Sequence, residues 1–103
     1  MMAVQFTATP DEREIVRRIS RRVAEFYVAQ GKEILPMDMM LEIQMDLCAV
    51  HANGCPMDFV RLEQADDFNL LHDVSGIARH LDRSTGKLTG MFRPRFAKKE
   101  VAV

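Results

Sequence analysis

The sequence predicts an all-α fold in a single domain, and three observations support this prediction. Four segments repeat their apolar residues every three or four positions, as amphipathic helices do. Turn-forming residues such as Gly31 and Asn53–Gly54 separate these segments. A chain of 103 residues also has the usual length of one domain. We therefore expect about four helices, one of them short, between an extended N-terminal arm and an extended C-terminal tail.

The expected helices begin at recognisable local signals. Thr9, Pro10 and Glu12 combine a capping box with a first-turn proline, which is typical of a helix start. Asp66 or Asp67 is suited to cap the last helix. The expected elements are an extended arm over 1–8, helices over 9–30, 37–52, 57–65 and 67–82, and an extended basic tail over 88–103.

A turn over residues 51–56 joins the second and third expected helices. Asn53 and Gly54 tolerate positive φ and favour the end of the second helix, and Pro56 fixes the direction of the chain that follows. His51 stands just before them, where a cation would suit the carbonyl end of the helix. We interpret the turn first as a structural joint.

The second expected helix is apolar on nearly every side. A helix of this kind must be covered on several sides, and thioether side chains pack adaptably against many neighbours. Burial in the core of the monomer is one interpretation, and half of a homodimer interface is the other. The second leads us to expect a homodimer. The apolar residues are Met37, Met39, Met40, Leu41, Ile43, Met45, Leu47, Cys48 and Val50.

Charge is strongly segregated along the chain, although the net charge is only −1. Residues 1–32 hold six basic and four acidic residues, residues 33–73 hold one and nine, and residues 74–103 hold seven and two. We expect the basic ends to fold back onto the acidic middle or to meet an acidic partner. Nucleic-acid binding is one alternative function, because arginines on one helix face and in the tail could contact phosphates. These are Arg17, Arg18, Arg21, Arg22, Arg93 and Arg95.

Composition argues against several classes of protein. No apolar run approaches the roughly 20 residues that span a bilayer, and the first residues lack the pattern of a secretory signal. Cys48 and Cys55 are too few for a disulfide scaffold. We expect a cytoplasmic protein with reduced thiols and no membrane contact. The sequence has no glycine-rich phosphate loop, and we expect no cofactor.

One short run suggests a metal site. Leu70-Leu71-His72-Asp73-Val74 resembles the Leu-Leu-His-Asp-Ile run of HD-domain phosphohydrolases. The resemblance implies that the His-Asp pair binds a divalent metal that activates water, with His51 as the upstream histidine. A metal-dependent phosphohydrolase site at His51, His72 and Asp73 is therefore a second alternative function.

Longer motifs give a wider resemblance. They are His51-Ala52-Asn53-Gly54-Cys55-Pro56, then Ala65-Asp66-Asp67-Phe68-Asn69 with His72-Asp73, and the ending Phe92-Arg93-Pro94-Arg95-Phe96. These motifs resemble a small family of short proteins encoded in bacteriophages and prophages of Proteobacteria. That family has no assigned activity, so the resemblance implies an accessory role. We expect a non-enzymatic protein-interaction module with a protein partner.

Overall fold

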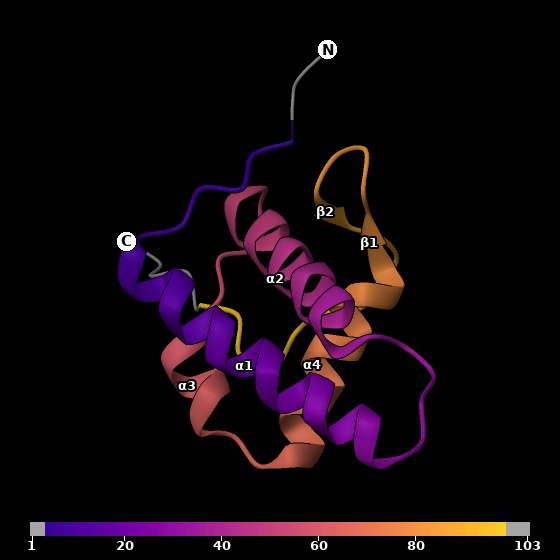
Figure 1. The fold of residues 1–103 in the computed structure, drawn as a ribbon. Coiled ribbons are helices and arrows are strands. Elements are labelled where there is room, and N and C mark those ends of the chain that lie inside the picture. The colour runs from indigo at the N-terminus through magenta and orange to yellow at the C-terminus, as the bar shows by residue number, and fades with distance from the viewer. Residues whose placement is uncertain (1–3, 99–103) are drawn as a thin grey trace.

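The computed structural model describes residues 4–98 and confirms the expected, mostly α-helical class. Within these residues, four helices pack around an apolar core and a small β-hairpin follows the last helix (Figure 1). The elements are α1 (Pro10–Ala29), α2 (Pro36–Ala52), α3 (Phe59–Gln64), α4 (Asp67–His80), β1 (Leu81–Asp82) and β2 (Lys87–Leu88). Residues 1–3 of the expected arm and 99–103 of the expected tail lie outside the described residues.

Polar side chains cap three of the four helices. The Thr9 hydroxyl accepts from the backbone N–H of Glu12 (3.1 Å), and the Glu12 carboxylate accepts from the N–H of Thr9 (3.0 Å). Asp58 and Asp66 accept from the N–H of the third residue of α3 and α4, at 3.2 and 2.8 Å. These bonds satisfy backbone donors that have no partner inside a helix.

The core lies where α1, α2 and α4 meet, and α3 closes it at one end. Figure 1 shows α2 in the middle of the fold, with α1 running along it. Each helix contributes side chains that are almost fully buried, so that no single helix forms the core by itself. The buried apolar residues of the helices and the α2–α3 connection include Val16, Ile19, Val23, Ile43, Leu47, Val50, Met57, Phe59, Leu62, Leu70, Val74 and Ile77.

The chain turns back after α4 in a small hairpin, between the expected last helix and the expected extended tail. Helix α4 ends at His80, two residues before the expected end, because Leu81 has an extended backbone (φ −78°, ψ 125°). Leu81 pairs antiparallel with Leu88, and Asp82 pairs with Lys87. A pairing of only two residues leaves no alternating pattern in the sequence.

The C-terminal segment, residues 89–98, lies over α4 and the start of α3. The Phe92 ring stacks on the His80 ring, with the centroids 5.1 Å apart and the planes at 7°. Gly76 makes room for this ring, because a Cβ on Gly76 would come within about 2.1 Å of Phe92. A glycine inside a helix costs about 1 kcal/mol relative to alanine. Here the glycine gives the C-terminal segment a place to dock.

The end of the segment is held by backbone contacts. The N–H of Asp58 donates to the carbonyl of Phe96 (2.8 Å), and the N–H of Lys98 donates to the carbonyl of Pro56 (2.8 Å). Met57, which is fully buried, forms an isolated β-bridge with Ala97. The C-terminal segment therefore joins the α2–α3 connection to α4.

Gly76→Ala should destabilise the protein by about 1–3 kcal/mol, the usual cost of overpacking, because the new methyl group displaces Phe92. In a Phe92→Ala background the same change should stabilise the protein by up to about 1 kcal/mol, because only the helix preference of alanine remains. Urea unfolding of the two single variants and the double variant measures both effects. Equal effects of Gly76→Ala in the two backgrounds would contradict this packing.

Candidate functional site

His51 lies in the last turn of α2 and is used through both ring nitrogens. Its Nδ1 accepts from the backbone N–H of Met57 (2.8 Å), and its Nε2 lies 3.0 Å from Oε2 of Glu12. Because Nδ1 accepts a hydrogen bond, the neutral ring carries its proton on Nε2, and this N–H donates a hydrogen bond to Glu12. His51 thus joins α2 to the start of α1 and to the α2–α3 connection, instead of capping the carbonyl end of α2.

The surroundings of His51 favour its neutral form. Burial lowers the pKa of His51, while the adjacent Glu12 carboxylate acts in the opposite direction. The pKa of Glu12 is itself lowered, mainly by the hydrogen bond from the Thr9 backbone N–H. Glu12 therefore completes the capping box of α1 with one oxygen and meets His51 with the other. The sequence signalled only the first of these roles.

Asp73 is fully buried in the middle of α4, and its carboxylate fixes the C-terminal segment. Oδ1 accepts from the backbone N–H of Arg95 (2.8 Å), and Oδ2 accepts from the N–H of Phe96 (2.9 Å). His72 Nδ1 lies 3.0 Å from Oδ1. Both oxygens of this buried acid are thus occupied by contacts within the chain, as the burial of a carboxylate requires.

The structure brings together only part of the predicted metal site. His72 is beside Asp73, whereas His51 is engaged by Glu12 and Met57. Among residues 4–98, no group of three or more His, Cys, Asp or Glu residues is arranged to hold a metal ion. The contacts that can be seen at His51 and Asp73 stabilise the fold.

The predicted phosphate-binding arginines of α1 are largely paired with acids of the same chain. Arg17 pairs with Glu14 (2.6 Å), a neighbour on α1. Arg18 and Arg22 form ion pairs with acids that are more distant in the sequence. Arg18 pairs with Glu63 (2.7 Å), and Arg22 pairs with Asp67 (2.6 Å).

Two of these arginines link α1 to α3 and α4. Arg22 also donates to the carbonyls of Glu63 and Ala65 at the end of α3. The basic N-terminal part therefore folds back onto the acidic middle, which is one of the two outcomes that the charge pattern predicted. Arg21 is exposed and takes part in no ion pair within the described part of the chain.

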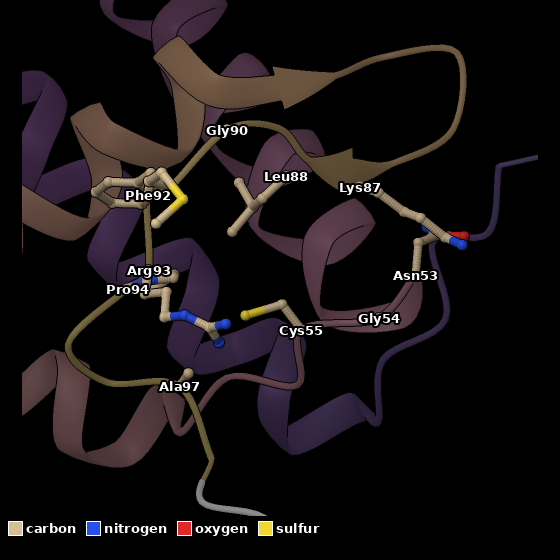
Figure 2. A pocket seen from close by; sticks show the side chains of 11 residues that line it. Asn53, Gly54, Cys55, Lys87, Leu88, Gly90, Phe92, Arg93, Pro94 and Ala97 are labelled. Atoms are coloured by element: carbon tan, nitrogen blue, oxygen red, sulfur yellow. The ribbon is translucent and has the colours of Figure 1, made fainter.

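The two predicted arginines of the C-terminal segment differ from each other. The Arg95 guanidinium lies over the Phe68 ring, 5.6 Å from its centroid, and hydrogen-bonds the Asn69 side chain. Arg93 instead lines a hollow of about 510 Å³. Figure 2 shows the Arg93 side chain extending toward the sulfur of Cys55.

This hollow is bounded by the predicted structural turn and by segments far along the chain. Gly54, which follows α2, has φ of +122°, and Pro56 leads toward α3. The side-chain amide of Asn53 donates to the carbonyls of Ala49 (2.6 Å) and Gln5 (2.8 Å), so Asn53 also secures the N-terminal arm. The opposite wall of the hollow comes from β2 and the C-terminal segment.

Part of α2 remains uncovered. Met37, Leu41 and Met45 recur every four residues on its outer face, and 66%, 53% and 57% of their surfaces are exposed. Leu35, directly before the helix, is 69% exposed. We call these four residues the α2 stripe. The methionine-rich helix is therefore only partly used by the core.

These features define a small, mostly α-helical protein whose C-terminal segment is held by a buried aspartate. A family model described as a family of unknown function, DUF6874, matches residues 11–98, and the chain belongs to that family. No match was found among curated proteins or among solved structures. Within residues 4–98, no helix is long and apolar enough to cross a membrane.

The stability of the protein should fall as His51 becomes protonated. Because the folded pKa of His51 lies below its ordinary value, the unfolded chain takes up this proton more readily, and acid favours unfolding. Relative to His51→Asn, which can accept from the Met57 N–H and cannot be protonated, the wild type should lose stability as the pH falls through 6.5, the ordinary pKa that His51 keeps in the unfolded chain. Urea unfolding at several pH values measures this difference.

Protonation of Asp46 changes the stability of the protein in the opposite direction as the pH falls. Burial raises its pKa to about 6, so the folded protein takes up that proton first and gains stability as pH falls. Since both proteins keep Asp46, the difference between them isolates His51. A difference that stays constant with pH would refute the arrangement of His51, Glu12 and Met57.

Proposed function

We propose that this protein is a non-enzymatic protein-interaction module that forms a homodimer through α2. The observation that supports the proposal is the α2 stripe, in which each side chain exposes more than half of its surface. Apolar side chains gathered on one exposed face favour association, because pairing two such faces removes them from water. Methionine suits such a surface, because its flexible side chain adapts to the facing residues.

The stripe is suited to a second copy of the same chain. In an antiparallel pair of α2 helices related by a two-fold axis, Leu41 would face Leu41 of the second copy, and Met37 would face its Met45. The equal spacing of these residues makes the surface complementary to itself. Each contact that lies off the two-fold axis would also occur twice, because the two copies use the same surface.

Charge beside the stripe supports the same pairing. Asp38 and Glu42 are one helical turn apart and share one flank of α2. Arg83 of the hairpin stands on that flank, 3.3 Å from both Glu42 and Asp46. The antiparallel pair would set Asp38 of one copy at the level of Arg83 of the other. Opposite charges would then flank an apolar centre, as in many interfaces.

The proposal extends to an accessory role in a bacteriophage or prophage. Its support is the resemblance of the 51–56 and 65–73 motifs to proteins of that setting. A non-catalytic role is supported by the contacts of His51 and Asp73, whose polar atoms hold elements of the fold together. The dimer would then present its remaining surface to a protein partner.

Sedimentation velocity at tens of micromolar tests the dimer. The wild type should sediment as a dimer, and Leu41→Asp should be monomeric, because it would place two carboxylates against each other at the two-fold axis. Val60→Asp is the matched control, since Val60 is equally exposed (53%) but lies on α3. Circular dichroism would check that both variants are folded.

The control should dimerise like the wild type. A wild type that is monomeric at these concentrations would overturn the proposal. So would a Leu41→Asp variant that dimerises as strongly as the wild type, because the interface would then lie elsewhere.

A further inference from the structure

The hollow between the 53–55 turn, β2 and the C-terminal segment has the size of a ligand site. Its volume of about 510 Å³ falls within the range of small-molecule pockets, roughly 300–1,000 Å³. Two stretches that are distant in the sequence form its walls, residues 53–55 and residues 87–97. Figure 2 shows Lys87 and Asn53 at one end, with Leu88 between them and Phe92.

The lining combines positive charge with apolar surface. Among the described residues that line it, Lys87 and Arg93 are the two cations and none is acidic. Most of the remaining wall is apolar and comes from one stretch of chain. The apolar lining residues include Leu88, Met91, Phe92, Pro94 and Ala97.

Both cations lack a counter-ion within residues 4–98. Neither Lys87 nor Arg93 forms an ion pair there, whereas Arg18, Arg22 and Arg83 each pair with a carboxylate. The Arg93 side chain extends toward the Cys55 thiol (Figure 2), and burial raises the pKa of this thiol. A thiol that stays protonated leaves the charge of Arg93 unneutralised. An anion entering the hollow would supply the missing charge.

We propose that this hollow binds a small amphipathic anion, with a carboxylate or phosphate group held by Arg93 and Lys87 and an apolar body held by Leu88 and Phe92. The planar guanidinium of Arg93 can bind either head group through two parallel hydrogen bonds. The apolar wall selects against simple inorganic anions, because they cannot cover it. Met91, which is 96% exposed at the rim, has a flexible side chain that can close over the bound body.

The arrangement also links ligand binding to the fold. Arg93 and Phe92 precede the two residues whose N–H groups donate to Asp73. Asp73 therefore fixes the backbone next to both binding side chains. A site whose backbone is held before the ligand arrives loses less entropy on binding.

Amide NMR titration of the full-length protein tests the proposal with three probes: octanoate, octyl phosphate and neutral octanol. Octanoate or octyl phosphate should give saturable shifts at residues 53–55 and 87–97, with Kd in the range of 1 mM or below, as expected for about ten non-hydrogen atoms. The tighter of the two identifies the head group. Octanol should bind at least roughly tenfold more weakly, because it cannot pair with Arg93.

Arg93→Gln should raise the Kd of the anionic probe roughly tenfold, because that is the usual effect of losing one charge-assisted hydrogen bond. Arg79→Gln, which removes an exposed arginine of α4 outside the hollow, should leave binding unchanged. Octanol binding as tight as octanoate, equal effects of the two substitutions, or shifts confined to other surfaces would each overturn the proposal. Inorganic phosphate binding as tightly as octyl phosphate would also overturn it, because the apolar wall would then contribute nothing.

Discussion

The carboxylate of Asp73 has no exposed surface, and it must therefore be satisfied inside the protein. A buried charge without hydrogen-bond partners would cost several kcal/mol. Asp73 finds its donors in the backbone N–H groups of Arg95 and Phe96, more than twenty residues along the chain. This one requirement determines where the C-terminal segment runs, and several other contacts depend on that course.

With the segment held at Asp73, Phe92 lies in the space beside Gly76 and stacks on His80. The backbone of Phe96 meets Asp58 at the start of α3, and Lys98 meets Pro56 in the connection from α2. One wall of the hollow described above consists of this same segment. A residue of the His-Asp pair that suggested metal chemistry thus sets both the packing of the chain end and the shape of the candidate ligand site.

The fold class could be predicted from the sequence because local signals determine it. The capping box at Thr9, the stop at Gly54 and the apolar repeats each act within a few residues, and the structure has helices beside all of them. Long-range partners were beyond this reasoning. The residues around Asp73 in the sequence do not indicate that its carboxylate accepts hydrogen bonds from Arg95 and Phe96. Those around His51 do not indicate its contact with Glu12. The charge pattern gave two alternatives, that the basic ends fold back onto the acidic middle or meet an acidic partner, and the ion pairs of Arg18 and Arg22 show the first for the N-terminal part.

The role of Asp73 is tested most directly by native-state amide hydrogen exchange at Arg95 and Phe96. In the wild type, both amides should be protected, and Asp73→Asn should lower their protection roughly tenfold to a hundredfold, the value of a hydrogen bond to a charged group. The amides of Leu47 and Val50 in the core of α2 should change less. Rapid exchange of Arg95 and Phe96 in the wild type, or protection unchanged by Asp73→Asn, would contradict the account.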